Sequence, residues 1–137
     1  MAGTFTLEIV TPEERLFKDE AQFVVVPEVN GELGVLRNHA PMIAALDIGI
    51  LRYTDANGAI KKMAVSGGFM EVMNNEVRIL AETAEPGSQI DVLRAKSALE
   101  RAERRLAAKT EDTNIVRAQM ALQRAIARIR AAEPGEK

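Results

Sequence analysis

The sequence predicts an α+β protein, with an N-terminal antiparallel β-sandwich over residues 1–85 followed by a C-terminal antiparallel two-helix hairpin over residues 86–137. In the first part, apolar residues recur at every second position, which is typical of half-buried strands. After Pro86-Gly87 the composition changes to Ala, Leu, Lys, Arg and Glu, which favour helices. Charge divides the chain at the same place, because residues 1–87 carry 7 basic and 13 acidic side chains whereas residues 88–137 carry 11 and 7.

Short strands joined by tight turns account for the first part. Residues 5–9 alternate between apolar and polar side chains, and residues 23–26 form a β-branched run that suits a strand buried on both faces. Asn57-Gly58 separates two such segments and predicts a tight hairpin, and Asn74-Asn75 has the same role further on. Many short strands without a long helix between them favour an antiparallel sandwich or barrel.

Two helices of similar length account for the second part. The first is expected to start in a capping box, in which Ser88 caps the helix and Asp91 answers at the third position, and to run to about Ala108. The second should reach about Ala132, where Pro134-Gly135 stops it. A short polar link joins them, so an antiparallel pair is expected. Candidate caps for the second helix are Thr110, Asp112 and Thr113.

The apolar faces of the two helices are rich in alanine. At about 25 cal/mol per Å² of buried apolar surface, such a pair gains only a few kcal/mol over separated helices, so we expect a marginal hairpin that can exchange partners. The expected faces are Ala95, Ala98, Leu99, Ala102 and Leu106 in the first helix, and Ile115, Ala118, Leu122, Ala125, Ile126 and Ile129 in the second.

Composition excludes several classes of function. The chain has no cysteine, which excludes disulfides and thiol catalysis, and its single histidine cannot form a histidine cluster, so no metal site is expected. The longest uncharged run, residues 38–46, is far shorter than the about 20 apolar residues of a spanning helix, so no direct membrane insertion is expected. Residues 1–8 contain neither a basic segment nor an apolar stretch, so no secretory signal is expected. The positive charge of residues 88–137 is too small for a nucleic-acid-binding arm, so no nucleic acid is expected.

No catalytic constellation stands out, so we expect a protein that is not an enzyme. Ser66-Gly67-Gly68 contains a hydroxyl but lacks the strand–turn–helix context of an activated nucleophile, which favours a bulge or a close backbone approach. The neighbouring acids Glu13-Glu14 and Asp19-Glu20 are expected to line solvated turns.

Arginines repeat at helical spacing on both helices. Such ribs can converge on a polyanion, because guanidinium groups match phosphate geometry well. They can equally be solvated and paired with Glu100, Glu103 or Glu111 in weak exposed ion pairs. Asp91 is open to two interpretations as well, as a helix cap or as a ligand contact. The two ribs are Arg94, Arg101 and Arg105, and Arg117, Arg124 and Arg128.

Taken together, several motifs in this order resemble the epsilon subunit of bacterial and chloroplast F-type ATP synthases. The resemblance covers nearly the whole chain and is carried by the following segments: Gly31-Glu32-Leu33-Gly34-Val35-Leu36, His39-Ala40-Pro41, Ser66-Gly67-Gly68-Phe69, Glu71-Val72, Leu80-Ala81-Glu82-Thr83-Ala84-Glu85 and Ile90-Asp91-Val92-Leu93-Arg94-Ala95.

The resemblance implies a sandwich of about ten strands in a non-catalytic rotor subunit that couples proton translocation to ATP synthesis. It implies binding to the gamma subunit, near His39, and to the membrane c-ring, which Glu32 would face. It further implies that the hairpin either lies on the sandwich or extends to the catalytic alpha/beta head and blocks ATP hydrolysis. The expected location is the cytoplasmic face of the bacterial membrane, held there through the complex.

In some bacterial members of that family the folded hairpin binds ATP as a regulatory ligand, and magnesium is not expected to be required. The chain departs from a fixed pattern at Pro86-Gly87-Ser88, where the family varies. By resemblance, the ATP-binding residues are Glu85, Ile90, Asp91, Arg94, Ala95, Arg101, Arg117, Arg124 and Arg128.

Two other functions stay open on sequence alone. The same arginines would serve a stand-alone module that senses ATP or phosphate, which should not co-purify with a motor. An esterase that uses Ser66 would lose its activity in Ser66→Ala, and we expect no such activity.

Overall fold

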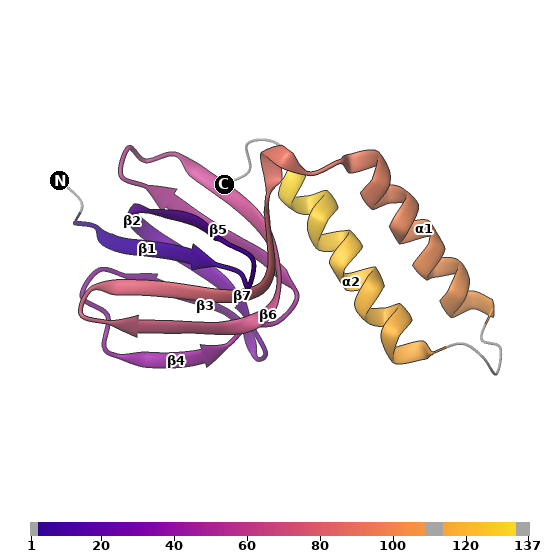
Figure 1. Ribbon diagram of the computed structural model, residues 1–137, viewed down its shortest axis with the longest axis horizontal. Coiled ribbons are helices and arrows are strands. Elements are labelled where there is room, and N and C mark those ends of the chain that lie inside the picture. Colours follow the sequence, from indigo (N-terminus) through magenta and orange to yellow (C-terminus); the bar gives the residue numbers. More distant parts are fainter. Residues whose placement is uncertain (1–2, 109–113, 134–137) are drawn as a thin grey trace.

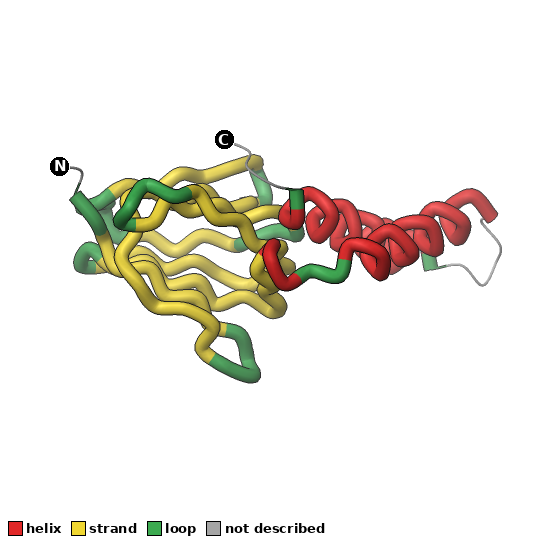
Figure 2. Tube along the Cα trace, turned by 90° about the horizontal axis from the view of Figure 1, so that it is seen from above, coloured by secondary structure: helices red, strands yellow, loops and turns green. Residues whose placement is uncertain are grey.

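Seven strands form the N-terminal part of the chain in the computed structural model, which describes residues 3–108 and 114–133. Two helices follow and project from the sandwich as a rod (Figures 1 and 2). The predicted fold class is confirmed. The strands are β1 (Phe5–Val10), β2 (Arg15–Glu28), β3 (Gly31–Leu36), β4 (Met42–Ala45), β5 (Gly49–Asp55), β6 (Ile60–Met73) and β7 (Glu76–Pro86).

The sheet closes on itself through its first strand. Strands pair in the order β1-β7-β6-β5-β2-β3, and β1 also pairs with β2, so β1, β2, β5, β6 and β7 form a ring. Four of the ring's pairings are antiparallel, as predicted, and the β1–β7 pairing is parallel. An odd-membered ring requires this departure, because strand direction cannot alternate all the way around it.

Two long strands explain why seven strands are seen where the family resemblance implied about ten. The first half of β2 pairs with β1, and its second half pairs with β5 and β3 after a register shift between Ala21 and Phe23. Likewise, β6 pairs with β5 near its start and with β4 near its end. Each long strand thus serves two layers, although it is continuous in the backbone.

The predicted turns lie where the sequence puts them. Asn74 and Asn75 both adopt positive φ, 53° and 61°, and connect β6 to β7. At the β5–β6 turn, the carboxylate of Asp55 accepts hydrogen bonds from the backbone N–H groups of Asn57 and Ala59, each at 2.9 Å, and these bonds lower the pKa of Asp55. The register of the long strands is therefore set locally.

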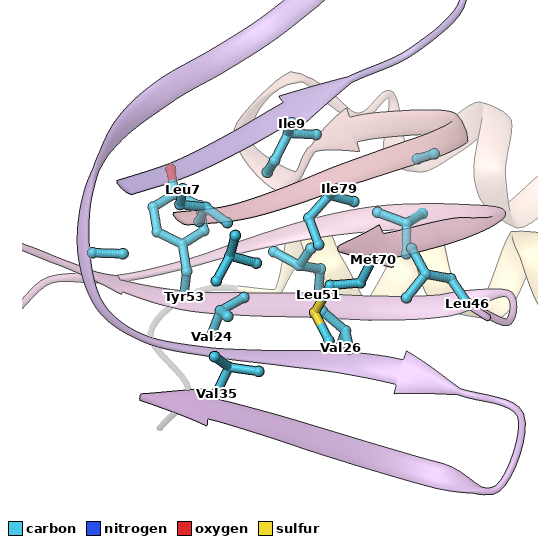
Figure 3. Packing of buried hydrophobic residues seen from close by; sticks show 14 of the residues in the cluster. Leu7, Ile9, Val24, Val26, Val35, Leu46, Leu51, Tyr53, Met70 and Ile79 are labelled. Carbon is cyan, nitrogen blue, oxygen red and sulfur yellow. The ribbon is translucent and has the colours of Figure 1, made fainter. Parts of the chain in front are cut away.

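One apolar cluster fills the space between the layers. Figure 3 shows Leu7 and Ile9 of β1, Val24 of β2 and Leu51 of β5 directed toward one another. All buried members of this cluster come from the strands and loops of the sandwich, within residues 5–81. The sandwich therefore has a core that does not depend on the hairpin.

Glu8 is a buried carboxylate that joins three strands. Its two oxygens lie 2.9 Å from Nε of Arg15 on β2 and 3.1 Å from Nε of Arg78 on β7. Burial by itself would raise the pKa of Glu8, but the hydrogen bond from Arg78 and the charges of Arg15 and Lys18 outweigh it and hold the pKa below its ordinary value of 4.5. Glu8 therefore stays ionised beneath the two arginine side chains on the outer face of the sheet.

This arrangement predicts acid sensitivity. Because the pKa of Glu8 is lower in the folded state than in the unfolded state, its contribution to stability is complete above pH 4.5 and is lost as the pH falls through the folded value. The free energy of unfolding should therefore fall less steeply below pH 4.5 in Glu8→Gln than in the parent chain. Urea titrations between pH 7 and pH 3 would measure this, and equal slopes would contradict it.

The first helix begins later than the capping box predicted. Residues Gly87–Gln89 form a short 3₁₀ helix, η1, and α1 (Val92–Ala108) follows it. Its cap is Asp91, whose Oδ1 accepts the backbone N–H of Arg94 at 3.1 Å, so the assignment of Ser88 as cap was wrong. The chain first has to turn away from β7, and this turn occupies the position expected for the cap.

Asn114 is the cap of α2 (Ile115–Ala132), where its side chain accepts the backbone N–H of Arg117. The candidates Thr110, Asp112 and Thr113 lie outside the described residues, as does Pro134-Gly135. The alanines expected to face the partner helix are buried or partly buried, whereas Ile115 is exposed. Within the described ranges, neither helix is both long enough and apolar enough to span a bilayer.

Candidate functional site

The hairpin meets the sandwich through a small apolar cluster, which we call the docking seam. It consists of Ala64 on β6, Ile90 after η1, and Ala127 and Ala131 on α2, with Ile50 and Ala132 packed at its edge. This cluster is separate from the core of the sandwich. Because three of its four buried members are alanines, the seam buries little apolar surface and holds the hairpin weakly.

Strand alternation builds one wall of a cavity beside the docking seam. Ala64 lies opposite Glu85 across the β6–β7 pair, and Ser66 lies opposite Thr83, so these four side chains share the face toward α2. Neighbouring Val65 belongs to the core on the other face. Together with α2, these strands enclose a cavity of about 290 Å³.

Two arginines of α2 close the cavity, which we call the arginine cavity. Nε of Arg128 donates a hydrogen bond to Oε1 of Glu85 at 2.9 Å, and Nη2 of Arg128 donates to Oε2 of Glu85 at 3.5 Å. Arg124 lies one turn earlier on α2 and lines the same cavity. One carboxylate faces two guanidinium groups, so the cavity carries a positive excess that favours an anionic ligand.

The predicted site residues at the start of α1 are held mainly by structural contacts. Ile90 is buried in the docking seam, and Ala95 is fully buried. Asp91 caps α1, which settles its structural role, and Arg94 is exposed in the first turn. The side chain of Arg94 is therefore free to reach a ligand that lies outside the docking seam.

The structure gathers only part of the predicted arginine set. Glu85, Arg124 and Arg128 line the arginine cavity, whereas Arg101 on α1 and Arg117 in the first turn of α2 are exposed and do not line it. Arg128 pairs with Glu85 rather than with a helix glutamate. The interpretation of the ribs as solvated ion pairs is thus wrong for Arg128.

The two predicted partner-binding residues lie on the sandwich. Glu32 on the edge strand β3 is exposed and accepts from Arg52 at 2.9 Å. His39 is partly exposed in the loop that leads into β4, where its Nδ1 lies 2.8 Å from the carbonyl oxygen of Ala40. Neither contact involves the hairpin.

An apolar patch lies on the outer face of β4, β6 and β7. Ala45, Phe69 and Leu80 stand in one row across these strands, and Ile43 is two residues from Ala45. Ile43 is 70% exposed, Phe69 is 55% exposed and Leu80 is 42% exposed. We call these four residues the apolar patch; grouped exposed side chains of this size are typical of interaction surfaces.

Sequence reasoning missed the hydroxyls of Ser66 and Thr83 as lining residues. The hydroxyl oxygens Oγ of Ser66 and Oγ1 of Thr83 lie 2.5 Å apart and share a hydrogen bond, and Ser66 is buried. The signal was present in the period of two, since Ala64 and Ser66, like Thr83 and Glu85, must share a face. The β6–β7 register is unchanged from Ser66 to Gly68, so the strands contain no bulge here. A Cβ at Gly68 would overlap the carbonyl oxygen of Leu80, which is the close backbone approach that the sequence offered as the other possibility.

Comparison with known proteins places both parts of the chain. Residues 4–87 match the family described as ATP synthase, Delta/Epsilon chain, beta-sandwich domain, and residues 88–133 match its long alpha-helix domain. The ATP synthase epsilon chain of Syntrophomonas wolfei is 64% identical over 131 residues, which cover 96% of each chain. That of Desulfitobacterium hafniense is 56% identical over 132 residues, which cover 96% of this chain and 98% of the relative.

Solved structures agree. A chain in the cryo-EM structure of the Euglena gracilis mitochondrial ATP synthase, described as OSCP/F1/c-ring in rotational state 1, matches with a TM-score of 0.84 at 26% identity, covering 95% of this chain and 82% of that one. A chain from the Tetrahymena thermophila central stalk and c-ring structure, 12% identical with a TM-score of 0.59, shares the fold. Both parts match in order, and the chain therefore belongs to the ATP synthase delta/epsilon chain family, as an epsilon-type member.

Proposed function

We propose that this chain is a non-catalytic subunit of the ATP synthase central stalk, which helps couple proton flow to ATP synthesis and limits ATP hydrolysis through its hairpin. The observation that carries the proposal is the thin docking seam, in which Ala127 and Ala131 hold α2 against Ala64 and Ile90. A hairpin attached so weakly can leave the sandwich and dock elsewhere at a small net cost. Its excess of basic residues suits acidic segments of an alpha/beta head.

The sandwich would supply the fixed attachment to the rotor. The apolar patch of Ile43, Ala45, Phe69 and Leu80 fits the gamma subunit as an apolar docking partner, and the loop with His39 leads directly into it. Glu32, on the edge strand, is the residue we assign to the c-ring side. The relative in the solved Euglena gracilis ATP synthase, whose structure includes F1 and the c-ring, supports this placement at the membrane surface through the complex.

ATP would hold the hairpin down as a regulatory ligand at the arginine cavity. The cavity of about 290 Å³ lies near the lower limit of the about 300–1,000 Å³ usual for ligand sites, so a nucleotide would extend beyond it toward α1 and Arg94. Glu85 belongs to the sandwich and Arg128 to α2, so a ligand that contacts both is bound tightly only in the docked state. Binding therefore shifts the population toward the docked hairpin.

Arg124 and Arg94 provide the test of nucleotide binding. Both are exposed, and a contact from either to phosphate is charge-assisted and worth about 1.5–3 kcal/mol, so Arg94→Ala or Arg124→Ala should weaken ATP binding by about 10- to 100-fold. Calorimetric titration of ATP into the isolated protein, with and without magnesium, measures this. Arg104→Ala, an exposed arginine outside both ribs, is the matched control and should change the affinity less than about twofold.

Absence of binding at millimolar ATP would end the nucleotide part of the proposal. The arginine cavity also suits a stand-alone module that senses ATP or phosphate, and this alternative predicts the same titration. Co-purification separates the two functions, because only a rotor subunit should retain the gamma subunit and the catalytic head.

A further inference from the structure

The carboxyl end of α2 is held by two contacts outside the arginine cavity. Lys62 on β6 reaches the last turn of α2 from one side, and Gly87 in η1 touches it from another. We propose that Lys62 and Gly87 form a latch that keeps the hairpin docked without any ligand. The proposal rests on the proposed function in one respect, since it requires a hairpin that can leave the sandwich.

Lys62 acts as a cap supplied by the sheet. Its Nζ donates to the carbonyl oxygen of Arg130 at 3.1 Å, and the backbone N–H of Glu133 reaches the same oxygen at 3.1 Å. The last carbonyls of a helix lack partners within the helix and form the negative end of its dipole, so an ammonium group is favoured there. This contact joins two parts of the chain 68 residues apart and is lost when α2 leaves.

Gly87 allows the two backbones to meet. A Cβ at this position would overlap the carbonyl oxygen of Ala131 and lie 3.3 Å from the carbonyl oxygen of Lys62. Both neighbours are backbone atoms, so no side-chain rotation relieves the overlap. Gly87 does not have a positive φ, so alanine fits its backbone conformation once α2 has gone. The severe overlap with Ala131 is therefore a property of the docked state, whereas the contact with Lys62 remains in both states and needs only a small shift of the backbone.

The latch and the nucleotide both favour the docked hairpin over the released one, but they do so through different contacts. Lys62 and Gly87 do not line the arginine cavity. Among the described residues, Glu85 forms its ion pair with Arg128 and not with the latch. A hairpin held in this way has a docked population even at low ATP. Substitutions in the latch should lower that population, whereas added ATP should raise it again.

Thiol accessibility in the docking seam measures the released fraction. The chain has no cysteine, so Ala64→Cys introduces a unique thiol that α2 covers when docked. In the full-length isolated protein without nucleotide, its rate of reaction with Ellman's reagent should rise at least about tenfold in Gly87→Ala, through backbone overlap, and about fivefold in Lys62→Met.

The controls separate the latch from unfolding. Gln89→Ala in η1 and Lys61→Met, whose lysine pairs with Asp55 instead, should leave the rate within about twofold. A second reporter, Ala44→Cys in the core of the sandwich, should react at an unchanged rate in both latch variants.

The latch proposal and the nucleotide proposal would be contradicted by different results. Latch variants that react no faster than their controls overturn the latch, and so does equal acceleration at Ala44→Cys, which would show that the sandwich itself opens. The proposed nucleotide control fails in a different way, namely if ATP leaves the rate at Ala64→Cys unchanged in the chain with an intact latch. Because the latch measurement contains neither nucleotide nor motor, the two results are independent.

Discussion

A chain that ends at Pro86 should still assemble into the motor, but ATP hydrolysis by that motor should rise about fivefold or more, the range of a typical coupling free energy. The sandwich should fold without the hairpin, because its core cluster lies entirely within residues 5–81. Truncation uncovers mainly Ala64 and Ile50, which adds little apolar surface. The truncated chain keeps the apolar patch, so it should still bind the motor. It lacks the hairpin, so it should no longer inhibit ATP hydrolysis.

Paired assays on the purified complex would check this. Co-purification with the gamma subunit reports attachment, and the ATPase rate with and without the hairpin reports inhibition. Gln89→Ala in the full-length chain controls for handling of the linker, since Gln89 is exposed and should leave inhibition intact. If inhibition persists in full after truncation, the hairpin is not the brake and serves as a passive spacer.

Gly68→Ala should destabilise the sandwich by about 3–5 kcal/mol, which approaches the whole stability of a small domain. Gly68 has a φ of +101°, where a Cβ is strained, and the added Cβ would also overlap the carbonyl oxygen of Leu80 on the neighbouring strand. Neither cost can be relieved by a side-chain rotation, because β6 and β7 pair on both sides of this position.

Gly58→Ala is the matched control for this prediction. Gly58 has a similar φ of +89°, but no atom lies within 4 Å of the position its Cβ would occupy, so only the strain of about 1–2 kcal/mol applies. Urea unfolding of both variants, followed by circular dichroism, gives the difference directly. Equal losses in the two variants would show that the close approach of β6 to β7 contributes nothing.

Local patterns predicted most of the sandwich and of the helices. The period of two identified the buried strand residues, and Asn57-Gly58 and Asn74-Asn75 marked the hairpins, because those turns require residues that tolerate positive φ. The closure of the five-strand ring could not be predicted from the sequence. The parallel pairing of β1 with β7 joins the first strand to the last, and no local pattern records it.

Only part of the site could be predicted in the same way. Glu85 and Arg128 were identified through family resemblance, but their pairing depends on which helix meets the sandwich. Both helices offer an alanine face to each other, whereas α2 alone buries a second ridge, Ala127 and Ala131, against β6. Those two residues are four apart and lie off the expected face, so this signal was present in the sequence. The start of α1 was misplaced because η1 intervenes.

The position of the docking seam has a mechanical consequence. The seam and the arginine cavity involve α2 only from Arg124 onward, while the rest of the rod points away from the sandwich (Figures 1 and 2). The part of α2 before Arg124, residues 115–123, is about 14 Å long, so a bend of about 10° at Arg124 sweeps its free tip through about 2 Å. The tip can therefore search for a partner before any anchored contact breaks. A partner would first bind the free tip of the hairpin. The contacts between α2 and the sheet would then break in order from Arg124 toward the carboxyl end, and those of the final turn of α2 would break last.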